Sequence, residues 1–154
     1  MPRKGKTSPA ERLQYVIVGN SAAGISAARQ IRRQEDRGRI AILSDEPGWG
    51  YSRVLLPLYI AGKISRRQMV IAPGNDYAAL RIRLLADDPV DSVDPRGQRI
   101  HTRKGTAVPY DRLLIATGSS PRVLDVPGHD LPGVHYLRKI TDAEAIRKDL
   151  SSSR

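Results

Sequence analysis

A glycine-bounded turn between an apolar run and a helical pattern is the feature that most constrains the fold of this chain. Residues 15–18 form a short run rich in β-branched residues, typical of a strand that is buried on both faces. The sequence GNSAAG follows at residues 19–24, and residues 22–34 repeat apolar side chains at helical spacing. A second apolar run occupies residues 40–43. This order predicts a βαβ unit with two parallel strands.

The turn has the residues expected of a dinucleotide-binding site. Its first glycine, Gly19, allows a sharp bend after the strand, and its last, Gly24, allows the helix to pack closely on the strand. The small residues Ser21, Ala22 and Ala23 let the backbone approach a diphosphate, and Ser21 replaces the usual middle glycine. A helix that starts here offers free N–H groups and a partial positive charge. We therefore predict that these five residues bind the diphosphate of a dinucleotide.

A dinucleotide site also needs a carboxylate about 20 residues after the last glycine, at the end of the second strand. There it accepts hydrogen bonds from ribose hydroxyls. Asp45 and Glu46 stand in this region, and Asp45 is the predicted ribose ligand. The position directly after the strand is Ser44, and an Asp-Glu-Pro sequence is also common in turns.

Other known turns fit the same residues less well. A P-loop needs a lysine where this chain has Ile25, and a nucleophile elbow needs a glycine where it has Ala23. The histidines, His101, His129 and His135, are available as bases, but surface or loop histidines are the ordinary interpretation. The sequence therefore predicts no catalytic acid, base or nucleophile, and no metal site.

The rest of the chain alternates short extended runs with helical patterns. The extended runs cover residues 83–86, 90–94, 99–102 and 113–116. Turn residues at 94–97 predict a hairpin between the second and third runs. We predict a short helix over residues 76–81 and a last helix over residues 141–150, where Thr141 and Glu144 form a capping box. The expected fold is α/β: a Rossmann-like parallel sheet with flanking helices and a small antiparallel β-meander.

Length and charge narrow the class of protein. The 154 residues amount to one domain, and 26 Lys and Arg against 16 Asp and Glu give a net charge of +10, which favours polyanionic partners. The absence of cysteine excludes disulfides, thiolate metal sites and cysteine redox chemistry carried by this chain. No apolar run approaches about 18 residues and no signal peptide is recognisable, so we predict a cytoplasmic protein with no membrane association. Residues 1–13 are expected to form a disordered basic leader.

Four longer stretches of the sequence, taken in their order along the chain, carry a resemblance to a known family. They are VIVGNSAAG, SDEPGWGYSRVLLPLYIAGKI, YDRLLIATGSSPR and GVHYLRKITDAEAI. Together they resemble the FAD-binding domain of the pyridine nucleotide-disulfide oxidoreductase family, and most of all its nitrite, rubredoxin and ferredoxin reductase branch. The resemblance covers residues 14–150. It implies that residues 14–154 are the N-terminal segment of an FAD-binding domain, without an NAD(P)H domain.

The resemblance also implies further contacts with FAD. The segment Ala116, Thr117 and Gly118 lies beside the cofactor in this family, where any larger side chain would collide with it. Arg53 matches an arginine near the FAD, and its planar guanidinium suits a phosphate or a ring. Val90 matches the position whose backbone contacts the adenine.

The function implied is that of an NAD(P)H-dependent flavoprotein oxidoreductase, in which electrons pass from nicotinamide through FAD to an unidentified acceptor protein or small molecule. Such chemistry belongs to the flavin. Val54 stands where disulfide members have a redox cysteine, and Leu58 where ferredoxin reductases have a lysine. The sequence also stops at Arg154, before the family's second glycine-rich domain and its later Gly-Asp element. We therefore expect this chain to be incomplete and inactive alone.

Two alternatives stay open. In the first, the chain is a non-catalytic module that uses its charge to bind a nucleotide or nucleic acid. In the second, it is a domain that binds NAD in place of FAD. Of the 26 basic residues, 20 are arginines, scattered without the interleaved aromatic residues of single-strand readers, which argues against nucleic acid. The electron acceptor, the preference for NADH or NADPH and the oligomeric state are not predicted.

Overall fold

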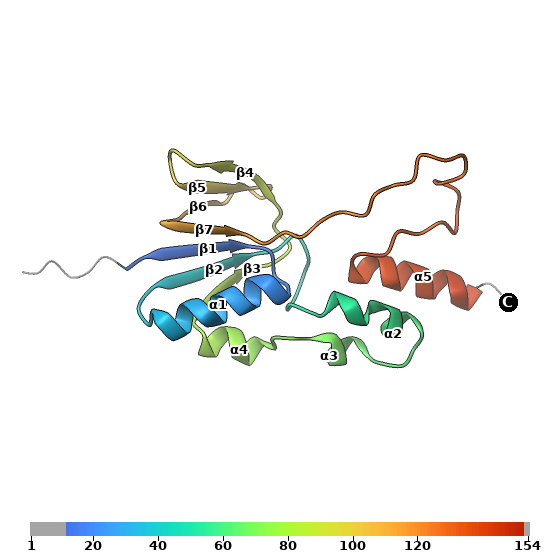
Figure 1. Cartoon of the computed structure of the whole chain (residues 1–154), viewed down its shortest axis with the longest axis horizontal. Coiled ribbons are helices and arrows are strands. Elements are labelled where there is room, and N and C mark those ends of the chain that lie inside the picture. The colour runs from blue at the N-terminus through green and yellow to red at the C-terminus, as the bar shows by residue number, and fades with distance from the viewer. Residues whose placement is uncertain (1–11, 153–154) are drawn as a thin grey trace, which may run out of the picture.

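The computed structural model describes residues 12–152, so residues 1–11 of the predicted basic leader lie outside the described residues. A parallel sheet with strand order β3-β2-β1-β7 forms the centre of the fold (Figure 1). Its strands are β1 (Gln14–Val18), β2 (Arg39–Leu43), β3 (Ile82–Leu85) and β7 (Arg112–Ile115). The predicted α/β class and parallel sheet are confirmed.

The first βαβ unit forms where the sequence predicts it. Helix α1 (Ala22–Gln34) has the predicted bounds, and it buries Gly24, Ile25 and Ala28. Helix α4 (Gly74–Ala79) lies on the same side of the sheet and starts two residues earlier than predicted (Figure 1). Ile17, Ile40 and Ile42 of the sheet pack in the same cluster as Ile25 and Ala28.

The other face of the parallel sheet is covered by the predicted meander. Its strands are β4 (Val90–Asp94), β5 (Arg99–Thr102) and β6 (Ala107–Pro109), which pair antiparallel in this order. Ile100 and Val108 of the meander pack with Val16, Ala41 and Leu43 of the parallel sheet. Both faces of β1 and β2 are therefore buried, which explains their continuous apolar runs.

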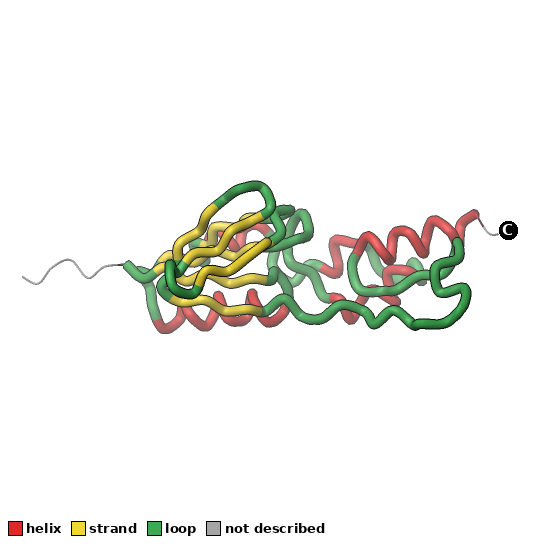
Figure 2. The backbone as a smooth tube through the Cα atoms, turned by 90° about the horizontal axis from the view of Figure 1, so that it is seen from above, coloured by secondary structure: helices red, strands yellow, loops and turns green. Residues whose placement is uncertain are grey.

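A helical extension lies beyond the carboxyl ends of the parallel strands (Figure 1 and Figure 2). It contains the 3-10 turn η1 (Arg53–Leu55) and the helices α2 (Leu56–Ile60), α3 (Arg66–Met69) and α5 (Ile140–Ser152). Leu56, Met69, Ile140 and Ala143 form its small core. The chain reaches α5 through residues 116–139, which contain no helix or strand.

The predicted capping box of the last helix is wrong. Helix α5 begins at Ile140, and Glu144 pairs with Arg66 at 3.1 Å instead of turning back to Thr141. The carboxylate of Asp142 accepts hydrogen bonds from the backbone N–H groups of Arg138, at 2.8 Å, and Lys139, at 2.7 Å. Asp142 therefore fixes the chain that enters the helix.

Within residues 12–152, none of the helices combines the length and the apolar character that crossing a bilayer requires.

Candidate functional site

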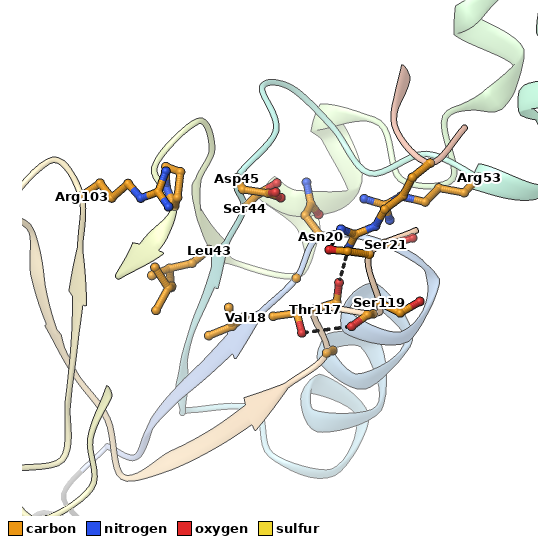
Figure 3. Close-up of a pocket in the computed structure, with 17 residues that line it drawn as sticks. Val18, Asn20, Ser21, Leu43, Ser44, Asp45, Arg53, Arg103, Thr117 and Ser119 are labelled. Atoms are coloured by element: carbon orange, nitrogen blue, oxygen red, sulfur yellow. Dashed lines mark hydrogen bonds between the residues drawn. The ribbon is translucent and has the colours of Figure 1, made fainter. Parts of the chain in front are cut away.

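A cavity of about 310 Å³ opens at the carboxyl edge of the parallel sheet, where β1, β2 and β7 end (Figure 3). The position is the one at which open α/β sheets generally bind ligands. Predicted cofactor residues that line it are Gly19, Ser21, Asp45, Arg53, Val90, Ala116, Thr117 and Gly118. The other predicted residues, Ala22, Ala23 and Gly24, continue the turn into α1 and do not line the cavity.

Gly19 is held in a conformation and a space that only glycine fits. Its φ is +121°, and a Cβ built on it would lie 2.2 Å from the carbonyl oxygen of Ala116. The Gly19 N–H donates to the carbonyl of Leu43 at 2.8 Å, and the Ala116 N–H donates to that of Val18 at 2.8 Å. The turn and the segment after β7 therefore meet backbone to backbone at the floor of the cavity.

Gly24 brings the start of α1 onto the same turn. A Cβ on Gly24 would lie 2.0 Å from the carbonyl oxygen of Gly19 and 3.2 Å from a methyl group of Ile17. The helix can approach the strand this closely only because residue 24 has no side chain.

The N-terminus of α1 is not neutralised by its own side chains. Ser21 is the N-cap residue, yet its hydroxyl makes no capping hydrogen bond, and the first turn of the helix holds no acidic residue. The first N–H groups of a helix have no partner within the helix and carry a partial positive charge. This end of α1 therefore favours an anion beside Ser21.

A buried tyrosine braces the turn from the side of α4. The hydroxyl of Tyr77 donates to Oδ1 of Asn20 at 2.5 Å and accepts a hydrogen bond from the N–H of Gly50 at 3.0 Å. Asn20 in turn donates to the carbonyl of Gly48 at 3.3 Å. Burial raises the pKa of Tyr77 above its ordinary value, so the hydroxyl stays protonated and keeps its role as donor.

Arg53 enters the cavity from η1 and is held by acidic and aromatic neighbours. The buried carboxylate of Glu46 pairs with its guanidinium and accepts a hydrogen bond from Tyr51 at 2.6 Å. The Tyr51 hydroxyl accepts one from the N–H of Ile140 at 2.8 Å. Burial, together with the hydrogen bond and the charge of Glu46, raises the pKa of Tyr51 well above its usual range. Within the described chain, the buried Nε of Arg53 has no hydrogen-bond partner.

Two further arginines line the cavity and were missed by the sequence analysis. Arg138 donates to the Ser120 hydroxyl and to the Thr117 carbonyl, both at 3.0 Å. It lies within the last of the characteristic stretches, which was its only signal in the sequence. Arg103 reaches the cavity from the turn between β5 and β6, beside Pro89 and Val90, and had no such signal (Figure 3).

Asp45, the predicted ribose ligand, lies at the cavity and is paired with a lysine from the start of α5. Lys139 Nζ lies 2.6 Å from Oδ2 of Asp45. Partial burial raises the pKa of Asp45, but the hydrogen bond and the charge of Lys139 outweigh it, so the net pKa lies below the ordinary value. The carboxylate is therefore ionised at neutral pH and can accept hydrogen bonds.

The cavity contains the residues of a binding site and none of the usual metal or acid–base sets. No histidine lines it. His135 lies elsewhere, where its Nε2 is 2.8 Å from a carboxylate oxygen of Asp149 on α5. Among the residues that the structure describes, no three His, Asp or Glu side chains are grouped so that they could hold a metal ion. The arrangement suits a ligand that combines an anionic centre with a hydroxyl-bearing group.

Comparison with known proteins decides the family. Residues 13–154 match the family described as pyridine nucleotide-disulphide oxidoreductase. The chain belongs to this family. The resemblance inferred from the sequence is thus confirmed.

Within the family, the curated relatives include rhodocoxin reductase of Rhodococcus erythropolis, which is 37% identical over 141 residues. That match covers 91% of this chain and 33% of the relative. The ferredoxin–NAD(+) reductase component of the biphenyl dioxygenase system of Paraburkholderia xenovorans is 34% identical, with 87% of this chain and 33% of the relative covered. The chain thus spans about a third of the length of these relatives.

Solved structures agree with this assignment. The putidaredoxin reductase–putidaredoxin complex matches with a TM-score of 0.79 and 32% identity over 90% of this chain and 34% of the other. The NADH:rubredoxin oxidoreductase of Clostridium acetobutylicum matches with a TM-score of 0.82 and 25% identity over 92% of this chain and 36% of the other.

Proposed function

We propose that this chain is the FAD-binding part of an NAD(P)H-dependent flavoprotein oxidoreductase, and that its cavity binds the ADP half of FAD. The observation that carries the proposal is the backbone contact between Gly19 and Ala116 beside the uncapped start of α1. This contact leaves main-chain atoms, rather than side chains, at the floor of the cavity. A diphosphate needs such a close approach to the backbone.

The residues around the turn fit a diphosphate. Ser21 and the first N–H groups of α1 supply hydrogen-bond donors, and Arg53 and Arg138 supply positive charge on the same cavity. The buried Nε of Arg53, which has no partner among the described residues, is a donor that an anionic oxygen would satisfy. Charge-assisted hydrogen bonds of this kind are stronger than neutral ones.

The other end of the cavity fits an adenosine. Asp45 and Val90 both line the cavity, which supports the ionised carboxylate of Asp45 as the acceptor for ribose hydroxyls and the backbone of Val90 as the contact for the adenine. Arg103 lies beside it and suits the face of a flat ring. The volume of about 310 Å³ lies at the lower end of the range for small-ligand pockets, which supports the ADP half rather than the whole cofactor.

When bound, FAD supplies the redox chemistry, and the residues of this chain bind and orient it. The relatives are named as reductases that connect NAD(+) or NADH with ferredoxin or rubredoxin, which supports NAD(P)H as the electron donor and a small redox protein as the acceptor. We place the protein in the cytoplasm, as its sequence predicts. Nucleic acid is not a proposed partner.

Titration of the 154-residue chain with FAD tests the proposal. We expect saturable quenching of flavin fluorescence, with ADP competing and FMN competing poorly, because FMN lacks the adenosine. Because NAD has no flavin fluorescence, calorimetric titration with NAD tests the alternative dinucleotide. Absence of FAD binding, or equal competition by ADP and FMN, would overturn the proposal, and salt-dependent retention on DNA without flavin binding would favour a nucleic-acid module.

A further inference from the structure

A second cavity, of about 500 Å³, lies at the opposite edge of the parallel sheet, where the strands begin. Its charged lining consists entirely of arginines, and no acidic residue among those described lines it. The arginines are Arg12, Arg32, Arg37, Arg39, Arg81 and Arg83, and we call this cavity the arginine pocket. The proposed FAD site lies at the carboxyl ends of the same strands, so the two cavities are separate.

The strand register explains why these side chains converge. Ala41 of β2 pairs with Arg83 of β3, and Arg39 lies two residues before Ala41. Since side chains alternate between the faces of a sheet, Arg39, Ala41 and Arg83 share one face. Ala41 packs under the meander with Val108. Arg39 and Arg83 therefore lie beside β6, whose residues 107–109 form part of the pocket wall.

The segment before β1 adds a further arginine to the pocket. The N–H of Arg39 donates to the carbonyl of Leu13 at 2.8 Å, which places Arg12 next to the start of β2. Arg37 precedes the same strand and also lines the pocket. Strands β2 and β3, helix α1 and the segments before β1, β2 and β3 thus contribute cations to one concave surface.

The arginines of the pocket are not equally free. Arg32 donates to the carbonyls of Leu80, at 2.9 Å, and Gly38, at 2.9 Å, and is a structural residue. Arg81 pairs with Asp36. The remaining four make no ion pair with any other residue in the range 12–152; they are Arg12, Arg37, Arg39 and Arg83.

Four unpaired guanidinium groups around one hollow repel one another, and a ligand with several negative charges would relieve this repulsion. Guanidinium groups bind phosphate through two parallel hydrogen bonds. The arginines surround a concave surface that also includes Ala41 and Val108 of the apolar cluster under the meander, and a concave surface suits a small ligand. The pocket lining includes no aromatic residue on which a nucleic-acid base would stack.

We propose that the arginine pocket binds a small ligand that carries several linked phosphate groups, either an inorganic oligophosphate or the phosphate tail of a nucleotide. This site is independent of the FAD site and is occupied by a different ligand. It also gives a role to arginines that the proposed FAD function does not use.

Calorimetric titration with tripolyphosphate tests the proposal. We expect saturable binding to the 154-residue chain that weakens as salt is added. The double variant Arg39→Ala/Arg83→Ala is expected to lose at least about tenfold in affinity while FAD binding is unchanged. The matched control Arg67→Ala/Arg122→Ala removes the same charge from exposed positions outside both cavities and should change affinity less than about twofold.

Further arms separate the sources of the ligand. If ATP binds as tightly as tripolyphosphate, the ligand is the phosphate tail of a nucleotide. If ATP binds more weakly, the ligand is an inorganic oligophosphate. Either result supports the site. If the alanine variant fails to fold, Arg39→Lys/Arg83→Lys keeps the charge and removes the planar fork, and a loss of about threefold or more supports the site. The proposal is overturned if tripolyphosphate does not bind saturably, if the two alanine doubles lose affinity equally, or if duplex DNA displaces tripolyphosphate.

Discussion

Lys139 and Asp45, 94 residues apart in the sequence, form an ion pair of 2.6 Å at the mouth of the candidate FAD cavity. The pair joins the end of β2 to the start of α5. Because Asp142 binds the backbone of Arg138 and Lys139, both cations are held on a fixed segment, where Arg138 lines the cavity and Lys139 pairs with the cavity residue Asp45. The helical extension thus contributes to the site as well as to the fold.

The ion pair predicts that the difference in stability between the wild type and Lys139→Ala depends on pH. The folded-state pKa of Asp45 is lowered, so the pair stabilises the fold above the ordinary value of 3.8 and the contribution is lost as pH falls through the folded pKa. At pH 7 we expect Lys139→Ala to lower the free energy of unfolding by less than about 1 kcal/mol, since both side chains are partly exposed. Urea unfolding should show the difference from wild type shrinking below about pH 4. Lys63→Ala, which has no charged partner among the described residues, should show no such trend.

Replacing Gly19 should remove FAD binding and destabilise the fold. In Gly19→Ala, the new methyl group meets the Ala116 carbonyl and the backbone is strained at positive φ, so we expect a loss of about 3 kcal/mol or more. Gly62→Ala is the matched control, because Gly62 also has a positive φ, +69°, but has open space around its Cα. It should cost about 1 kcal/mol and leave FAD binding intact. Equal effects of the two variants on FAD binding would contradict the site.

The brace between Tyr77 and the turn can be tested by removing one hydroxyl. Tyr77→Phe leaves the buried Gly50 N–H without its acceptor and frees Asn20, so we expect a loss of about 1–3 kcal/mol in stability and weaker FAD binding. Tyr59→Phe is the control, since it keeps the ring that packs on Arg147 at 4.6 Å. Chemical denaturation and flavin titration of both variants give the comparison. FAD affinity unchanged in Tyr77→Phe would show that Asn20 holds its place without the brace.

Glu46 should stabilise the fold by neutralising Arg53. Glu46→Gln leaves the half-buried guanidinium without its counter-charge, and we expect a loss of about 1–3 kcal/mol. Adding Arg53→Met removes the unpaired charge and should recover at least half of that stability, whereas FAD affinity should fall below that of Glu46→Gln because a cavity cation is gone. Double-mutant unfolding measurements check this. Additive losses would mean that the two side chains are not coupled.

The central fold could be predicted from the sequence because its signals are local. The bounds of α1 and β5 are those predicted, since the helix follows a glycine turn and the strand is flanked by turn residues. Strand β6 was missed because it has only three residues and ends in Pro109. The helices α2 and α3 were missed because each is stabilised by packing in the extension more than by its own short sequence.

The candidate site could be predicted only in part, because some of its residues lie in local motifs and others are brought to it by tertiary packing. Gly19 and Ser21 lie in a turn whose spacing has a physical meaning, whereas Ala116 was assigned only through the family resemblance. Arg103 reaches the cavity only through tertiary packing, and no sequence pattern links Lys139 to its partner Asp45. The roles of the site residues toward FAD stay predictions until binding is measured.

The five-residue length of β1 and β2 also limits communication between the two cavities. At about 3.3 Å per residue, these strands separate the arginine pocket from the glycine turn by roughly 17 Å. Exposed charges that far apart are screened at physiological ionic strength, where the Debye length is about 8 Å. Two anions could therefore occupy opposite ends of one small sheet and fill independently, each leaving the other's dissociation constant almost unchanged.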